Sequence, residues 1–308
     1  MDGILPLWKE RGMTSHDCVS KLRKILHTKK VGHGGTLDPD VDGVLPICIG
    51  KGTKVIEFLT DSGKEYEGEI TLGYATTTED ASGEVVQRDT IKTPFSSEEI
   101  DQAMQSFVGE IVQVPPMYSA VKVNGKRLYE YAREGQTVER PQRKVQVDSF
   151  VRTNAPAYQE EQQLQSWRFK VACGKGVYVR TLAVDTGKVL GVSAHMSDLT
   201  RTKSAGFTKE PSVTLDQVKK AVEEDRINDI LFPIEYGVQG FQRVDISDDL
   251  WQKVRNGMRL PYQAFQLAAM PTEPVAVFYQ NQVVSLYEPN KNETNKLKPL
   301  KVLQNEVS

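Results

Sequence analysis

The chain has 308 residues, of which 39% are hydrophobic and 26% charged, a composition typical of a globular protein with one large and one small domain. Its formal net charge of -2 argues against indiscriminate coating of nucleic acid, although net charge says little about local clusters. The N-terminal segment has no basic stretch followed by a long apolar run, and no later segment is long enough to cross a bilayer. We therefore expect a cytoplasmic protein with no membrane segment.

The first predicted element is an amphipathic helix over residues 15–27. Thr14 and Asp17 form a capping-box pattern ahead of apolar residues at helical spacing. Residues 18–37 contain several lysines and arginines but no aspartate or glutamate before Asp38. Further basic clusters lie within residues 115–144 and 291–301. Each cluster alone is typical of a solvated face, but together they indicate an anionic partner.

The segment GHGGTLDPDVDGVLP (32–46) follows this helix and frames one carboxylate, Asp38. Pro39 disfavours helical backbone at Asp38, and the preceding glycines allow other groups to approach closely, as an active-site loop requires. The DPDVDG run also resembles the start of a calcium loop, but Ile49 stands where a bidentate Glu is needed. No phosphate-loop pattern occurs, and the three cysteines are far apart in apolar surroundings, so neither metal nor disulfides are indicated.

The later elements alternate irregularly between strands and helices. A half-buried strand is expected over 65–74, with Tyr66 on the apolar face, and a capping pattern at Ser96 predicts a second amphipathic helix. An exposed hairpin and short helix are expected over 114–135, with the turn at Asn124 and Gly125. Residues 166–191 then predict a strand, a glycine turn, a second short strand and a helix ending at Gly191, and further helices are expected near 215–224 and 248–256.

These elements predict an α+β fold on a mixed or antiparallel sheet, with no internal repeat. The pattern changes near residue 239 to short strands and a lysine-rich tail. We expect a main domain over 1–238 and a small C-terminal domain over 239–308.

Four segments then carry a resemblance: GHGGTLDPDVDGVLPICIGKGTK, KEYEGEITLG, PPMYSAVKVNGKRLYEYAREG and GVYVRTLAVDTG. Together, and in this order, they resemble the bacterial tRNA pseudouridine-55 synthases, the TruB family, over most of residues 3–210. The resemblance implies a pseudouridine-synthase fold with a mixed, largely antiparallel sheet flanked by helices. It also implies that residues 114–145 are an insertion that grips the T-loop, and that 239–308 form a small barrel-like RNA-binding domain of PUA type.

The implied activity is isomerisation of a T-loop uridine, at position 55 of tRNA, to pseudouridine without cofactor or metal. Asp38 falls on the family's nucleophile, with an ordinary pKa that leaves it ionised, and Arg180 on the arginine paired with it. Tyr66 matches the tyrosine that stacks on the flipped base. The other residues implied to bind substrate are His33, Tyr178, Leu199, Lys9 and Lys54. Two positions depart from the family pattern: Glu10 stands where Pro is common, and Gly34 where Thr is common.

Three hypotheses remain distinct. The first is an RNA isomerase that uses Asp38, attacking either the sugar carbon C1′ or the base carbon C6, with the proton-abstracting group unassigned. The second is a module that binds and refolds tRNA without chemistry, and the third is a calcium-dependent protein. Surface patterning shows no large oligomer interface, so we expect a monomer.

Overall fold

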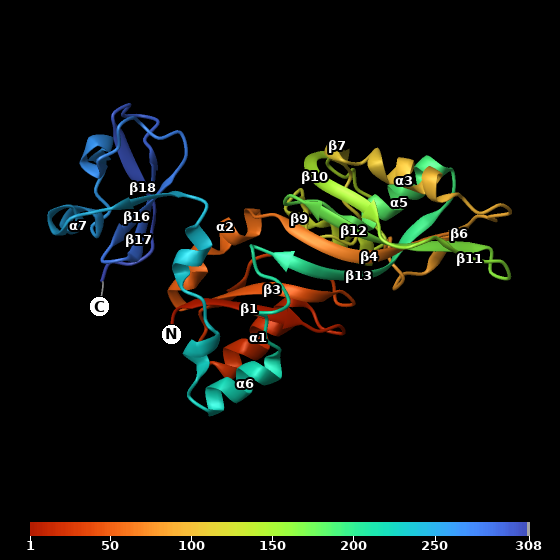
Figure 1. The fold of residues 1–308 in the computed structure, drawn as a ribbon, viewed down its shortest axis with the longest axis horizontal. Helices are drawn as coiled ribbons and strands as arrows, with labels where there is room; N and C mark the ends of the chain where they lie inside the picture. Colours follow the sequence, from red (N-terminus) through yellow and green to blue (C-terminus); the bar gives the residue numbers. More distant parts are fainter. Residues whose placement is uncertain (307–308) are drawn as a thin grey trace.

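A nine-stranded sheet forms the body of the computed structural model, which describes residues 1–306 (Figure 1). Its main path runs β1, β3, β13, β4, β12, β10, β7, and β2 and β11 pair with β3 and β12. Every pairing is antiparallel except that of β3 with β13. The predicted α+β fold with a mixed, largely antiparallel sheet is therefore confirmed. The strands are β1 (Gly3–Lys9), β2 (Val31–His33), β3 (Asp42–Ile49), β4 (Lys64–Leu72), β7 (Gly109–Gln113), β10 (Arg143–Arg152), β11 (Ala157–Gln159), β12 (Leu164–Cys173) and β13 (Ala194–Ser204).

Two pairs of helices cover different ends of this sheet (Figure 1). Helices α1 (Ser15–Ile25) and α6 (Leu215–Glu223) share an apolar core with β1 and β3. Helices α3 (Ser97–Gln105) and α5 (Val179–Leu190) pack on β4, β10 and β12. The capping boxes predicted at Thr14 and Ser96 are both present, because each hydroxyl accepts a backbone N–H and each N3 carboxylate reaches back to the cap.

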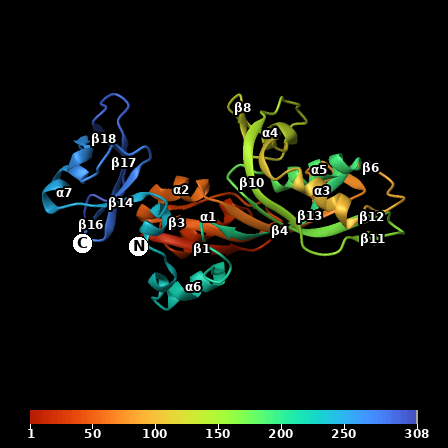
Figure 2. The same cartoon turned by 45° about the horizontal axis from the view of Figure 1, so that its top comes forward.

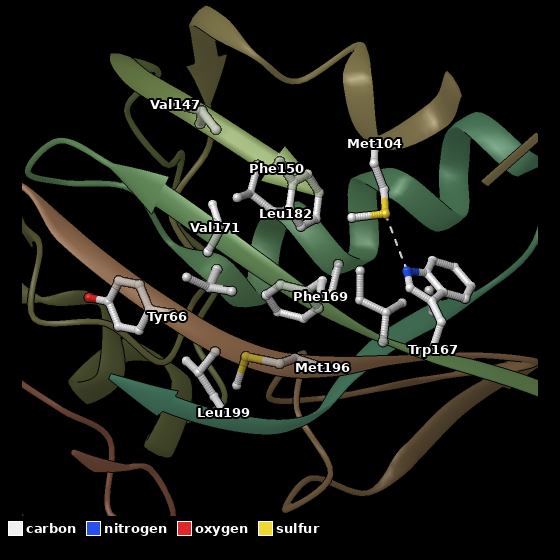
Figure 3. Packing of buried hydrophobic residues seen from close by; sticks show 14 of the residues in the cluster. Tyr66, Met104, Val147, Phe150, Trp167, Phe169, Val171, Leu182, Met196 and Leu199 are labelled. Atoms are coloured by element: carbon white, nitrogen blue, oxygen red, sulfur yellow. Dashed lines mark hydrogen bonds between the residues drawn. The ribbon is translucent and has the colours of Figure 1, made fainter. Parts of the chain in front are cut away.

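Strand β4 carries the predicted alternation. Tyr66, Ile70 and Leu72 are buried, whereas the glutamates between them are half-buried. Figure 3 shows Tyr66 at the edge of the apolar cluster, with its hydroxyl turned away from Phe169. The predicted strand was too long at its end, because the chain turns at Gly73 (φ 116°) and begins β5 (Tyr74–Thr76), which pairs with β6 (Val85–Arg88).

The expected hairpin and short helix of the insertion are also present. Strands β8 (Lys122–Val123) and β9 (Lys126–Arg127) meet at Asn124 and Gly125, both with positive φ, and α4 (Leu128–Arg133) follows. Figure 2 shows β8 and α4 standing above the sheet beside β10. Their base is anchored by buried Val121 and Leu128.

The prediction of a second short strand near residues 176–180 is wrong. Tyr178 is instead the N-cap of α5, and Arg180 lies in the first turn of that helix. The side chain of Gln113 explains the change, because its Nε2 donates to the Tyr178 carbonyl (3.1 Å) and its Oε1 accepts from the Tyr178 amide (2.9 Å). Those contacts occupy backbone groups that a strand pairing would need.

A second, five-stranded sheet holds the C-terminal part, in the order β14, β16, β17, β18, β15 (Figure 1). It encloses its own apolar core, and with β14 and β15 as free edges it is a curled half-barrel. A fourth apolar cluster joins this sheet to the nine-stranded one, because Ile4, Val55 and Ile234 pack with Phe278 and Leu286. The elements are β14 (Gln242–Asp245), α7 (Asp248–Val254), β15 (Leu260–Pro261), η4 (Tyr262–Phe265), β16 (Val275–Tyr279), β17 (Gln282–Pro289) and β18 (Lys296–Val302).

Short helices complete the chain: η1 (Gly50–Val55), α2 (Ile56–Asp61), η2 (Ile227–Ile230) and η3 (Ile234–Val238). The three cysteines are buried and free. In the part of the chain that the structure describes, no helix combines the length and the apolar character needed to cross a membrane.

Candidate active site

The centre of the candidate site is an ion pair between Asp38 and Arg180, two residues far apart in sequence. Asp38 lies in the loop between β2 and β3, and Arg180 lies at the start of α5. Arg180 Nε is 3.1 Å from Asp38 Oδ2, and Arg180 Nη2 donates to Asp38 Oδ1 at 3.3 Å. The arginine side chain is only 6% exposed while that of Asp38 is 39% exposed. A buried guanidinium thus holds both oxygens of a carboxylate that solvent can still reach.

Two other loops complete the surroundings of Arg180. Its Nη1 donates to the Thr78 carbonyl and its Nη2 to the Tyr118 carbonyl, both at 2.9 Å. Asp80 Oδ2 lies 3.8 Å from Nη1. Thr78 and Asp80 were not predicted as site residues, because the polar segment 76–83 carries mostly turn-type residues and nothing in it indicates long-range contact with Arg180.

Burial raises the pKa of the Asp38 carboxyl above its ordinary value, and the charge of Arg180 opposes that rise. The nearby Asp80 carboxylate adds to the rise. The pKa of Asp38 is therefore higher than the ordinary value that we expected from the sequence. The Arg180 guanidinium favours the ionised form of Asp38, which is the form that nucleophilic attack requires.

Lys9 supports the loop that carries Asp38. Its Nζ donates to the Pro39 carbonyl (3.1 Å) and to the Glu10 carbonyl (3.0 Å), and the residue is fully buried. Burial lowers the pKa of this ammonium. Lys9 therefore lies next to the site as predicted, but its position suits holding the loop and not contact with RNA.

Tyr66 and Leu199 lie on the neighbouring strands β4 and β13, in the same apolar cluster (Figure 3). They are 8% and 6% exposed. Burial raises the pKa of the Tyr66 hydroxyl, so the phenol stays neutral. Tyr178 is half-buried at the N-cap of α5, two residues before Arg180. Tyr66 and Leu199 thus pack in a cluster that includes Leu37 and Val179, the chain neighbours of Asp38 and Arg180, and Tyr178 caps the helix that carries Arg180.

His33 ends β2, just before the Asp38 loop. Burial lowers the pKa of its imidazole, which favours the neutral form, and its Nδ1 is buried without a hydrogen-bond partner among residues 1–306. The departure at Gly34 also has a local effect, because an added Cβ there would lie 3.1 Å from Leu59 Cβ. A threonine would require Leu59 to shift.

Lys54 does not join the site. Its Nζ donates to the carbonyls of Val302 (2.9 Å) and Leu303 (3.0 Å), so the ammonium binds the C-terminal half-barrel. Nearby, Lys301 pairs with Glu57. Two donors of this ammonium are occupied by backbone carbonyls of the half-barrel, so this geometry gives Lys54 a structural contact and does not support its assignment as a substrate-binding residue.

Two of the three carboxylates in the DPDVDG run, Asp38 and Asp42, bind different partners. Asp38 pairs with Arg180, while Asp42 Oδ1 accepts from Arg11 (3.1 Å) and from the Thr200 hydroxyl (2.6 Å). Within residues 1–306 no three His, Cys, Asp or Glu side chains gather as a metal site would need. The arrangement suits chemistry by a carboxylate and a guanidinium.

Comparisons with known proteins identify the family of this chain. Residues 23–179 match the TruB family pseudouridylate synthase N-terminal domain, and residues 180–239 match the tRNA pseudouridylate synthase B C-terminal domain. The tRNA pseudouridine synthase B of Lactiplantibacillus plantarum is 52% identical over 309 residues, covering 98% of each chain. Those of Listeria innocua and Bacillus pumilus are each 50% identical, covering 99% and 98% of each chain.

Two solved structures superpose on nearly the whole of this chain. A chain of a Cbf5-Nop10-Gar1 complex superposes with a TM-score of 0.75 at 28% identity, covering 98% of this chain and 85% of that one. A chain from an H/ACA RNP bound to a substrate RNA containing 2′-deoxyuridine superposes with a TM-score of 0.71 at 25% identity, with coverages of 98% and 85%. On its sequence, its fold and the relatives that match nearly its whole length, the chain belongs to the TruB family of pseudouridylate synthases.

Proposed function

We propose that this chain is a tRNA pseudouridine synthase that isomerises uridine 55 of the T-loop and uses Asp38 as its nucleophile. The observation that carries the proposal is the Asp38–Arg180 ion pair, with its carboxylate open to solvent and its guanidinium buried. Family membership supplies the reaction, and the pair supplies a group able to perform it.

The reaction needs no net transfer of atoms beyond proton exchange. The Asp38 carboxylate adds to the substrate at the sugar C1′ or the base C6, and the bond between N1 and C1′ breaks. The uracil turns within the pocket, a bond forms between C5 and C1′, and the C5 proton leaves to solvent while N1 gains one. Asp38 is released unchanged, so the proposed reaction proceeds without metal or cofactor.

The target base must leave the folded T-loop before Asp38 can reach it, at a cost of a few kcal/mol. Stacking on an aromatic ring returns ~1–3 kcal/mol per base, and Tyr66 is the aromatic residue we assign to that role. Leu199 and Tyr178 close the pocket, and His33 contacts the loop left by the flipped base as a neutral imidazole.

The insertion offers a surface suited to RNA. On α4 and its hairpin, Arg127 and Arg133 lie 5.7 and 5.2 Å from the Tyr129 ring, and Lys126 lies 4.7 Å from the Tyr131 ring. Cations beside aromatic rings suit phosphates and unstacked bases. We assign residues 114–145 to gripping the T-loop.

We assign residues 1–238 to catalysis and the half-barrel over 239–308 to RNA binding. The basic cluster in this tail contributes less than its sequence indicates, because Lys296, Lys298 and Lys301 are paired with Glu293, Glu288 and Glu57. The proposed enzyme acts as a monomer in the cytoplasm, where its tRNA substrate is made.

Tritium release from unmodified tRNA carrying 5-tritiated uridine tests the proposal. With chelator present, we expect about one tritium per tRNA, because each isomerisation expels one C5 hydrogen, and a product confined to the T-loop. Release from other positions would contradict the assigned substrate. Tight tRNA binding without any release would instead favour the module that only binds and refolds tRNA, and activity lost on chelation would favour the calcium-dependent alternative.

A further inference from the structure

Arg201 is a fully buried arginine that the reaction described above does not use. It lies on β13, two residues after Leu199. Its Nε donates to the Val44 carbonyl (2.8 Å), its Nη1 to Thr36 (3.2 Å) and its Nη2 to Gly35 (3.3 Å). All three acceptors are backbone carbonyls, and they stand on both sides of Asp38 in the chain. Burying a charge costs desolvation free energy, which the hydrogen bonds to these three carbonyls partly offset.

The position of Arg201 in the sheet indicates its role. Strands β3 and β13 form the one parallel pairing of the nine-stranded sheet, and that junction consists of two residue pairs, Thr200 with Asp42 and Arg201 with Gly43. On one side of the junction lie β1, β2 and β3, which carry the Asp38 loop. On the other side lie β4 and α5, which carry Tyr66 and Arg180. The relative position of nucleophile and pocket therefore depends on a short seam.

Arg201 spans that seam with both its backbone and its side chain. Its backbone pairs with Gly43 on one side and with Tyr66 on the other. Gly43 has φ +128°, and a Cβ there would lie 2.2 Å from the Arg201 carbonyl oxygen, so the approach needs glycine. The register of β13 against β4 shifts just after Arg201, and such bulges re-aim side chains near functional sites.

We propose that Arg201 is a positioning residue for the reaction, a buried clamp that fixes the Asp38 loop against the strand carrying Tyr66. This inference rests on the proposed function for its kinetic consequence, but the clamp itself belongs to the free protein. None of the three hydrogen bonds of Arg201 reaches the Asp38 carboxylate, and all three end on the backbone of residues 35, 36 and 44. The guanidinium also lies near the Tyr66 hydroxyl, where its charge opposes the burial that raises the pKa of that group.

The variant Arg201→Lys tests the clamp, because one ammonium keeps the charge but lacks the planar fork that reaches all three carbonyls. A displacement of about 1 Å at a reacting group can cost ~100-fold in rate, so we expect a single-turnover rate of tritium release lower by about that factor. The dissociation constant for tRNA should stay at the wild-type value, because the RNA-facing side chains are intact. The matched control is Arg168→Lys, on β12, whose exposed side chain pairs with Asp198 and should leave both quantities unchanged.

Amide hydrogen exchange of the free protein tests the same clamp without any reaction. We expect faster exchange in residues 34–42 for Arg201→Lys, with no change there for Arg168→Lys. If wild-type protein released no tritium, the proposed function would fail, while faster exchange would still support the clamp. A folded Arg201→Lys variant with wild-type exchange in this loop, or with wild-type rate in an active enzyme, would overturn the inference. A rate loss matched by an equal loss of tRNA affinity would do the same, because it would make Arg201 a binding residue.

Discussion

Replacing Arg180 by methionine tests how much the site depends on its buried guanidinium. The change removes the donors to Thr78 and Tyr118, and each hydrogen bond from a charged group contributes roughly 1.5 kcal/mol or more. The pair with Asp38 adds less than about 1 kcal/mol, because that carboxylate is 39% exposed. We therefore expect the free energy of unfolding in urea to fall by about 3–4 kcal/mol, the sum of these contributions.

The effect on catalysis follows from the pKa of Asp38. Burial raises this pKa and Arg180 lowers it, so the folded enzyme without Arg180 has a still higher value. At any acidic pH a smaller fraction of Asp38 is then ionised, and the acid limb of the single-turnover rate moves to higher pH. At the pH optimum the carboxylate has also lost its orientation, which we expect to cost ~100-fold in rate.

The matched control is Arg152→Met, which breaks an equally well-formed pair far from the site. Arg152 Nε and Nη2 donate to the two oxygens of Asp101 at 2.9 and 2.8 Å, linking β10 to α3. It should lower stability without moving the rate or its acid limb. A folded Arg180→Met enzyme with wild-type rate and an unmoved acid limb would refute the role given to Arg180.

Three further predictions follow from the same geometry. Tyr66→Leu should slow single-turnover release and weaken tRNA binding by ~1–3 kcal/mol through lost stacking, whereas Tyr66→Phe should retain affinity in a filter-binding assay. Lys54→Met should weaken binding of full-length tRNA but not of an isolated T-arm hairpin, because it loosens the half-barrel held at Val302 and Leu303; equal losses for both RNAs would make Lys54 a direct contact. Gln113→Leu should lower the free energy of unfolding by about 2 kcal/mol, since it breaks both bonds to the Tyr178 backbone, and an unchanged urea midpoint would contradict this.

Sequence reasoning succeeded where structure is set locally. Capping boxes at Thr14 and Ser96, the alternation around Tyr66 and the turn at Asn124 each depend on residues a few positions apart, and each is present. The resemblance then supplied Asp38 and Arg180 as partners across 142 positions, and the structure brings them together.

The sequence was a poor guide wherever a residue's conformation or contacts depend on groups far away in the chain. The strand expected at Tyr178 became a helix cap because Gln113, on another strand, binds its backbone. The sequence around Lys54 would be the same whether this residue faced RNA or the half-barrel. Only the position of the half-barrel shows that its ammonium donates to Val302. Arg201 could not be found at all, since the carbonyls that it binds carry no signature in sequence.

The central claim is that the Asp38 carboxylate attacks the uridine, and the variant Asp38→Asn tests it most directly. Asparagine keeps the size and hydrogen-bonding reach of aspartate but lacks the charge needed for attack. Single-turnover tritium release should be abolished, while the dissociation constant for unmodified tRNA stays close to that of the wild type. Release from Asp38→Asn at a substantial fraction of the wild-type rate, with the pseudouridine still in the T-loop, would contradict the account.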